Sequence, residues 1–193
     1  MAVATLAGCG QANVDEEVRG ETLTVYYGVP LHGPDAERGR ATVAGAKRAL
    51  ADAGGEAAGF RVEPVFLDDA GGRDVSFHPR VTADGARRAA IDVTALAYVG
   101  DLGGDATRIS LPLTNGADMP QLVPATVLAA LRADGPGAGL LEPTGRRTAV
   151  PVAGSGEAFG RRATQLLLEA IEAAGDGATK RALVLDRLQQ LRR

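Results

Sequence analysis

Two adjacent carboxylates, Asp68 and Asp69, stand directly after a run of alternating apolar and polar residues at positions 60–67. The run indicates a half-exposed strand, and the end of a strand is a common place for catalytic acids and metal ligands. One hypothesis is therefore a small flavodoxin-like enzyme that uses Asp68 or Asp69. The competing interpretation, which we favour, is that the pair only caps the following loop. We expect no enzymatic activity.

Other side chains with catalytic or metal-ligating chemistry are sparse. His32 and His78 are the only histidines, and they fall in different loops with no cysteine or clustered carboxylates near them in the sequence. A zinc site, or any other metal site, is therefore not expected. Residues 100–104 form a glycine-rich turn, but the turn lacks the G-x-G-x-x-G spacing and the lysine of a phosphate-binding loop. We expect no cofactor.

That turn and the chain after a second apolar run are the expected ligand-binding segments. Residues 95–100 form a short apolar run that ends at Gly100, and residues 119–123 form another that Pro124 closes. Between them, Asp105 is placed to cap the first turn of a helix. Strand, turn, helix and strand make one βαβ unit, and open α/β sheets bind ligands where strands end at such turns. Residues 100–107 and 123–126 are therefore predicted to border any small-molecule site.

The elements that would position these segments alternate along the chain. We expect strands at residues 22–29, 60–67, 95–100, 119–123 and 148–152. Helices are expected at residues 35–53 and 79–92, from 105, at 128–133, from 159 to 174 and from 178. Pro64 indicates an edge position for the second strand, because proline donates no ladder hydrogen bond. The prediction is an α/β fold with a doubly wound, mostly parallel sheet in the order 2-1-3-4-5, flanked by helices.

Composition limits the classes of function. The chain has 193 residues, of which 45% are hydrophobic and only 4% aromatic, and this fits one globular domain with a core of alanine, valine and leucine. The net charge of -3 gives no sign of a basic surface, so nucleic acid is not an expected partner. No run of about 20 apolar residues occurs, so no helix is expected to cross a membrane.

The only cysteine lies in an amino terminus of small and apolar residues. Leu-Ala-Gly-Cys at positions 6–9 resembles a bacterial lipobox, where a peptidase cuts before a cysteine that is then lipidated. No Lys or Arg precedes Arg19, so the basic region of a secretory signal is missing. We predict a lipoprotein signal remnant and polar tether at residues 1–20, lipidation at Cys9, and one domain at residues 21–193. The alternative is a chance cysteine in a disordered tail.

From about residue 22 to residue 176 the sequence resembles lobe one of the type I periplasmic binding proteins, the solute receptors of branched-chain amino acid ABC transporters. The matching pieces are Gly-Val-Pro-Leu-His-Gly at 28–33, Leu-Asp-Asp at 67–69, Ala-Tyr-Val-Gly at 97–100, and Met-Pro-Gln-Leu-Val-Pro-Ala at 119–125. The resemblance implies an extracytoplasmic, membrane-anchored protein that binds an amino-acid-like solute. It implies ligand contacts from Leu31, His32, Leu102, Gly103, Gly104, Asp105, Thr107, Pro124, Ala125 and Thr126.

Two departures from the family pattern change these expectations. The chain passes from Val152 to Phe159 with no room for a second lobe, and Gly104 and Val123 stand where the family has hydroxyl side chains. We therefore expect free leucine, isoleucine or valine to bind no tighter than about millimolar.

The missing lobe also implies a partner. A single lobe would expose Val29, Leu31, Leu102 and Val127, and such a face favours an ABC permease or a second copy of the chain. The alternative function is a degenerate protein-interaction module that binds no small molecule.

Overall fold

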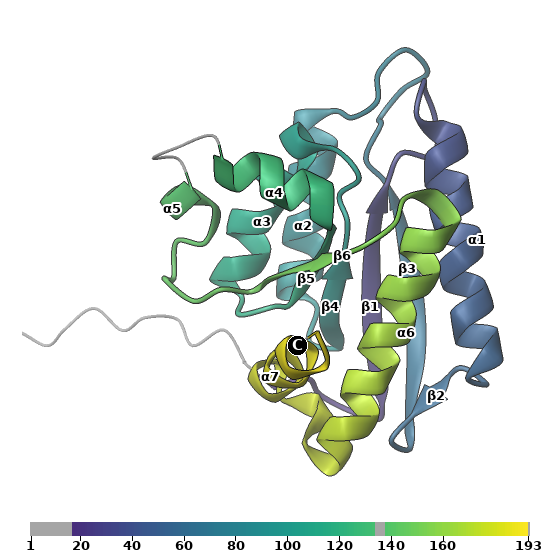
Figure 1. Ribbon diagram of the computed structural model, residues 1–193, viewed down its shortest axis with the longest axis vertical. Helices are drawn as coiled ribbons and strands as arrows, with labels where there is room; N and C mark the ends of the chain where they lie inside the picture. Colours follow the sequence, from purple (N-terminus) through teal and green to yellow (C-terminus); the bar gives the residue numbers. More distant parts are fainter. Residues whose placement is uncertain (1–16, 134–137, 193) are drawn as a thin grey trace, which may run out of the picture.

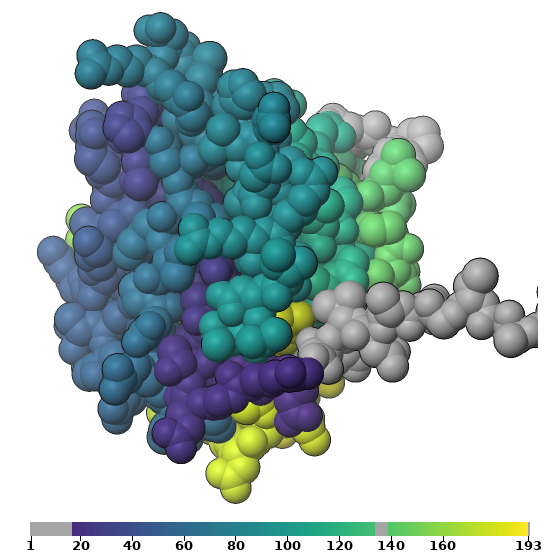
Figure 2. Space-filling view, turned by 180° about the vertical axis from the view of Figure 1, so that it is seen from behind, coloured from purple at the N-terminus to yellow at the C-terminus, as the bar shows by residue number. Residues whose placement is uncertain are grey.

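The computed structural model describes residues 17–133 and 138–192. Cys9 and the anchor predicted from it lie outside these residues. Among residues 17–20, Glu17 forms an isolated antiparallel bridge with Lys180, and Val18 is buried in the main core. Figure 2 shows residues 17–21 lying beside the carboxyl-terminal segment on the reverse side of the molecule.

One sheet of six strands runs through the protein (Figure 1). Its strands are β1 (Thr22–Val29), β2 (Glu56–Ala57), β3 (Phe60–Asp68), β4 (Ala95–Val99), β5 (Gln121–Pro124) and β6 (Ala149–Val152), in the order β2-β3-β1-β4-β5-β6. All neighbours are parallel except β2, which is antiparallel to β3. The predicted doubly wound order is confirmed, and only the two-residue β2 is additional.

The position of Pro64 in β3 is compatible with its lack of a backbone N–H. It pairs with Val25 of β1 on one side, and β2 covers only Phe60 and Arg61 on the other. The rest of that edge of β3 has no strand beside it. The edge position predicted from Pro64 therefore holds for the part of β3 in which the proline stands.

Helices cover both faces of the sheet. They are α1 (Ala36–Asp52), α2 (Pro79–Ile91), α3 (Gly104–Gly116), α4 (Ala125–Ala133), α5 (Ala138–Leu141), α6 (Gly156–Ala174), the 3-10 helix η1 (Gly175–Thr179) and α7 (Arg181–Leu191). In Figure 1, α1 and α6 lie together on one face, and α2 and α3 on the other.

Alternation along β1 divides the core between these faces. Val25, Tyr27 and Val29 pack with α1 and α6, whereas Tyr26 packs with residues of α2 and of the strand starts. Phe159 of α6 is fully buried and belongs to the first cluster. Burying such a side chain contributes roughly 1.5–3 kcal/mol, so both layers stabilise the sheet.

The close crossing of α1 and α6 depends on a glycine. A Cβ added at Gly160 would lie 2.0 Å from the carbonyl oxygen of Thr42, so no other residue fits without moving a backbone. This contact keeps α6 close against α1 and thereby holds the carboxyl-terminal part of the chain on the first half of the sheet.

The helices expected from residues 159 and 178 begin at Gly156 and Arg181, and two further predicted helix starts, both near the expected site, need correction. The helix expected from residue 128 begins at Ala125, so Ala125 and Thr126 lie in its first turn and not in a loop. The helix expected from Asp105 begins at Gly104 with Gly103 as its N-cap, and no side chain caps it. Asp105 therefore stands in the first turn, where its charge is favourable to the helix dipole, but the predicted cap is wrong. Within the described ranges, every helix is too short or too polar to cross a bilayer.

Candidate functional site

The ends of β1, β3 and β4 border a small hollow, which we call the Asp69 hollow. Its volume is about 210 Å³. It is lined by Pro30, Asp35, Arg38, Asp69, Ser76, Phe77, Leu102, Gly103, Gly104, Asp105 and Ala106. These residues come from the loops after three neighbouring strands and from the starts of α1 and α3. This is the edge of an open α/β sheet at which ligands bind.

Asp68 has a structural role at this edge. Its Oδ1 accepts hydrogen bonds from the backbone N–H groups of Leu31, at 2.8 Å, and Ala70, at 3.2 Å. Its Oδ2 lies against Nδ1 of His32. Partial burial acts to raise the pKa of Asp68, but the hydrogen bonds from His32 and the two amides outweigh it and hold this pKa below its ordinary value. Asp68 thus fixes the loop after β1, with Leu31 half-buried and His32 exposed.

Asp69 has a different environment. Only 3% of the residue is exposed, and its Oδ1 has no hydrogen-bond partner among the described residues. Burial is the largest cause that raises the pKa of Asp69 to about 8, and the charges of Asp101 and Asp68 act in the same direction. Arg38 opposes them only in part. A buried carboxyl oxygen with no partner is costly, so this group is either a source of strain or a ligand contact.

A buried network supports the hollow from below. Asp101 follows β4, and its carboxylate accepts hydrogen bonds from the hydroxyl of Tyr98, at 2.9 Å, and from that of Ser110. The Ser110 oxygen also accepts a hydrogen bond of 2.8 Å from Nε2 of Gln121. Burial raises the pKa of Asp101 to about 6, against the effect of both hydroxyl donors. The network depends on Gly28, because a Cβ there would lie 2.0 Å from the Tyr98 hydroxyl.

The ionisable side chains around the Asp69 hollow are mostly acidic. Asp35, Asp69 and Asp105 line it, and Asp101 lies behind it. Arg38 is the only basic lining residue, and its Nη2 is paired with Oδ1 of Asp35 at 3.3 Å. A ligand carboxylate would be repelled here, whereas a cation or a hydrogen-bond donor would be attracted. In the part of the chain that the structure describes, no three His, Cys, Asp or Glu side chains are grouped to hold a metal ion.

The structure separates the residues predicted to contact a ligand. Leu102, Gly103, Gly104 and Asp105 line the Asp69 hollow. Thr107 is buried, and its hydroxyl donates to the carbonyl oxygens of Asp101 and Gly103, so it faces its own backbone. Pro124 is a buried strand residue, Ala125 lines a second hollow, and Thr126 is exposed.

The face predicted to be left open by the missing lobe does not expose the apolar side chains that were expected there. Val29 is fully buried and Leu102 is 4% exposed, because α1, α3 and the loops after the strands close over them. Leu31 and Val127 are only partly exposed. The expected exposed patch of four apolar residues is therefore wrong, although a partner at this edge stays a prediction.

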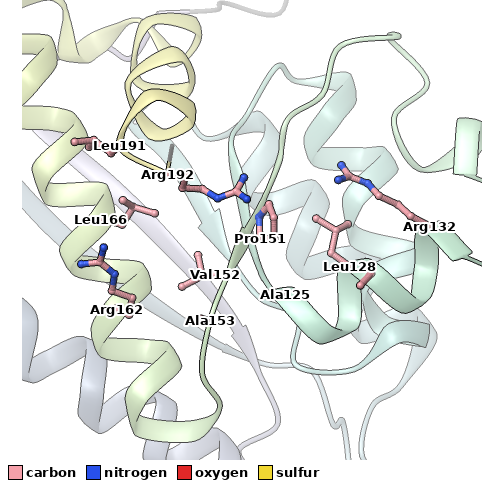
Figure 3. Close-up of a pocket in the computed structure, with 11 residues that line it drawn as sticks. Ala125, Leu128, Arg132, Pro151, Val152, Ala153, Arg162, Leu166, Leu191 and Arg192 are labelled. Carbon is pink, nitrogen blue, oxygen red and sulfur yellow. The ribbon is translucent and has the colours of Figure 1, made fainter.

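The second hollow lies along the outer edge of β6, and we call it the β6 hollow (Figure 3). It has a volume of about 540 Å³. Its lining residues come from α4, β6 and the chain after it, α6, and the end of α7: Ala125, Leu128, Ala129, Arg132, Pro151, Val152, Ala153, Arg162, Leu166, Leu191 and Arg192. Two of its three arginines are paired with glutamates, Arg132 with Glu142 at 3.4 Å and Arg162 with Glu169 at 3.8 Å. The hollow therefore has an apolar floor with basic side chains around it.

Sequence reasoning missed several residues of the Asp69 hollow. Arg38, Ser76 and Phe77 come from segments with no recognisable motif. The Asp68–Asp69 doublet was the available signal. Capping describes Asp68 correctly, but it does not describe Asp69.

Comparison with known proteins places the fold. No family model matches the sequence, and no curated protein matches it. Among solved structures, an ABC transporter substrate-binding protein from Sphaerobacter thermophilus has a TM-score of 0.63 at 11% identity, over 87% of this chain and 85% of that one.

Two further structures match over less than half of their own length. A leucine-binding protein from Thermotoga maritima has a TM-score of 0.51 at 16% identity, over 88% of this chain and 46% of its own. An ABC transporter solute-binding protein from Rhodopseudomonas palustris, solved with 3,4-dihydroxybenzoic acid, has a TM-score of 0.54 at 17% identity, over 89% and 45%. At these identities the likeness concerns the fold alone. This chain has the fold of one lobe of a type I periplasmic binding protein.

Proposed function

We propose that this protein binds a small solute as a single-lobe relative of the receptors of ABC-type transport systems, and serves uptake or sensing. Branched-chain amino acids or related small solutes are the proposed class. The observation that carries the proposal is the Asp69 hollow at the carboxyl edge of a sheet with this fold, in which a buried carboxyl oxygen has no protein partner.

Binding is favoured over catalysis by what lines the hollow. Its lining includes no histidine, cysteine or lysine that could act as a base beside a nucleophile. Asp68, one of the two residues of the enzyme hypothesis, is occupied in capping. The second, Asp69, has no titratable partner other than like charges and Arg38. We therefore propose a protein without enzymatic activity.

A single lobe limits the affinity that we propose. Association costs roughly 4 kcal/mol or more of lost freedom, and the contacts that a second lobe would add are not available within this fold. Free leucine, isoleucine or valine is therefore expected to bind no tighter than about millimolar. A second copy of the chain or a permease at the carboxyl edge would supply further contacts.

The test is a calorimetric and NMR screen of amino acids, amines and aromatic acids, with a variant that fills the hollow. Gly103 lines the hollow, and an added Cβ there meets nothing within 4 Å, so Gly103→Phe adds a bulky ring at the rim without displacing backbone. The control is Gly116→Phe, at the far end of α3, where the added Cβ is equally free. We expect Gly103→Phe to abolish solute binding and Gly116→Phe to preserve it. Equal binding by both variants, or no solute bound by the wild type, would contradict the proposal.

The β6 hollow favours a second candidate function, a protein-interaction module. Its basic rim and apolar floor lie beside a four-residue edge strand, and such a surface suits a protein segment with acidic and apolar residues. An ABC permease is the partner that the fold suggests. Substituting Arg162 and Arg192 by Ala should then weaken the binding of a co-expressed permease without changing solute binding.

Anchoring at the cell surface is also proposed. If the lipobox at residues 6–9 is used, Cys9 becomes a lipidated amino terminus. Mass spectrometry of the membrane fraction should then find a diacylglyceryl group on Cys9. A chain that keeps Met1 and stays in the cytoplasm would contradict the proposed extracytoplasmic location.

A further inference from the structure

We propose that the Asp69 hollow takes the ammonium group of a small primary amine, with Asp69 as the carboxylate that anchors it. This inference rests on the proposed solute-binding function and names the chemical class of the solute. It also assigns a role to a residue that the resemblance to receptors did not single out.

The first step is the unmet hydrogen-bonding capacity of Asp69. Its Oδ1 is buried without a partner, while the neighbouring Asp68 uses both carboxylate oxygens within the protein. A carboxylate oxygen accepts up to two hydrogen bonds, and burial makes each missing bond costly. Oδ1 itself is enclosed, but Asp69 lines the hollow, so a donor bound there lies beside the carboxyl group and can supply the missing bond once that group turns toward it.

The second step is the sign of the charge. Asp35, before α1, and Asp105, in the first turn of α3, line the same hollow, and the charge of the buried Asp101 acts on Asp69 from beneath it. The single basic group, Arg38, is already paired with Asp35. A bound cation lowers the repulsion among these carboxylates, whereas a bound carboxylate adds to it. The hollow therefore selects a cationic donor.

The third step is size and polarity. The volume of about 210 Å³ admits a molecule of only a few carbon atoms beside the charged group. Pro30, Phe77, Leu102 and Ala106 supply an apolar part of the lining. A short alkyl chain that carries one ammonium group matches both parts of the hollow.

Proton release follows from this arrangement. The pKa of Asp69 is raised to about 8 by burial and by the charges of Asp101 and Asp68, so most molecules of the free protein hold a proton there at neutral pH. An adjacent ammonium group stabilises the charged carboxylate and displaces that proton. Affinity for an amine should thus rise as the pH increases toward about 8 and level off above it.

The experiment compares three molecules with the same branched alkyl chain by NMR titration and calorimetry. Isopentylammonium carries only the cation, 4-methylpentanoate only the carboxylate, and leucine both. The proteins are the wild type, Asp69→Asn, and the matched control Asp176→Asn, which changes an exposed carboxylate in η1. Asp69→Asn keeps the shape of the side chain and removes its charge.

We expect isopentylammonium to bind the wild type at least about tenfold more tightly than 4-methylpentanoate. The amine makes a charge-assisted hydrogen bond, whereas the carboxylate is repelled by the acidic side chains. Asp69→Asn should weaken the amine by at least about tenfold, and Asp176→Asn should leave its affinity unchanged. Amine affinity in the wild type should rise with pH.

Four outcomes would overturn the inference. If 4-methylpentanoate binds at least as tightly as the amine, or if Asp69→Asn leaves amine affinity unchanged, the ammonium assignment fails while solute binding stands. If carboxylate affinity falls as the pH passes about 8, protonated Asp69 acts as a donor to an anion instead. If none of the three molecules and no member of the wider screen binds, the proposed function fails together with the inference.

Discussion

Two buried ionisable side chains lie at opposite edges of the sheet, and their hydrogen bonding differs. At the amino edge, Arg181 is 2% exposed and donates to three backbone carbonyl oxygens: Nε to Ala95 at 2.9 Å, Nη1 to Ala117 at 3.0 Å and Nη2 to Asp92 at 3.4 Å. At the carboxyl edge, Asp69 is 3% exposed and its Oδ1 has no partner. The two side chains are equally buried, but Arg181 makes these three hydrogen bonds and Oδ1 of Asp69 makes none.

The difference separates a structural charge from a functional one. Arg181 joins the start of α7 to the segments that follow α2 and α3, so its hydrogen bonds hold the last helix under the sheet (Figure 1). Asp69 joins nothing through Oδ1, and burial together with the charges of Asp101 and Asp68 raises its pKa to about 8. Groups that are buried, perturbed and placed in a concave surface are candidates for function, whereas fully bonded ones are candidates for stability.

The largest effect is expected at the amino edge. Arg181→Met keeps an apolar chain of similar length but removes the guanidinium donors from the buried carbonyl oxygens of Ala95 and Ala117, while that of Asp92 keeps the N–H of Ala95. We expect the free energy of unfolding to fall by about 3 kcal/mol, measured by urea denaturation. Arg80→Met, at an exposed position of α2, is the control and should change it by less than about 0.5 kcal/mol. If Arg181→Met lowers the free energy of unfolding by less than about 1 kcal/mol, Arg181 is not the stabilising group that the comparison requires.

At the carboxyl edge, by contrast, a substitution is expected to stabilise the protein. The pKa of Asp69 is raised from its ordinary value of 3.8 to about 8, so the folded state holds a proton that the unfolded state releases. The stability of the wild type therefore falls as the pH rises through this range. Asp69→Asn removes the free-energy cost of ionising this buried group. We expect the variant to be more stable than the wild type by about 2 kcal/mol or more near pH 8.

That gain should shrink as the pH is lowered toward 3.8, where Asp69 is protonated in both states. Urea denaturation of the two proteins at several pH values measures it. The titration of Asp101, whose pKa is about 6, changes the stability of both proteins to about the same extent, so it drops out of the difference between them. A stability difference that does not depend on pH, or a variant less stable than the wild type throughout, would mean that Asp69 is not held in its unfavourable state.

The smallest effect is expected at His32, which lies beside the hollow without lining it. Its side chain is 63% exposed, and its contact with Asp68 is a surface pair. Asp68 keeps its two backbone hydrogen bonds when the ring is removed. His32→Ala should therefore change the free energy of unfolding by less than about 1 kcal/mol and leave solute affinity unaltered. A clear loss of affinity would restore His32 as a ligand contact, as the sequence predicted.

The fold was predictable because its signals are local. Short apolar runs at β4 and β5, alternation in β3, and Pro64 at an edge together indicate the strand order that the structure confirms. The start of α4 was placed late because Pro124 indicates the end of a strand and says nothing about the residues after it. The two-residue β2 depends on a tight turn back onto Phe60 and Arg61, which hydrophobic periodicity does not detect.

The site was predictable only in part, because burial of a polar residue is a tertiary property. The glycine turn at Gly103 and Gly104 was found as the end of a strand, and it lines the hollow. Asp68 and Asp69 are adjacent in sequence, yet one caps two amides and the other is enclosed by residues 30–38, by Ser76 and Phe77, and by residues 102–106. No pattern of spacing distinguishes them. The closure of Val29 and Leu102 likewise depends on how the loops fold over the strand ends.

The most direct test of the account is to map where isopentylammonium binds, by following backbone amide chemical shifts during a titration of the wild type. The account predicts that the largest changes fall on Asp69, Ser76, Phe77 and residues 102–106, around the Asp69 hollow. Changes centred instead on Leu128, Val152 and Leu166, around the β6 hollow, or no saturable change at any residue, would contradict it.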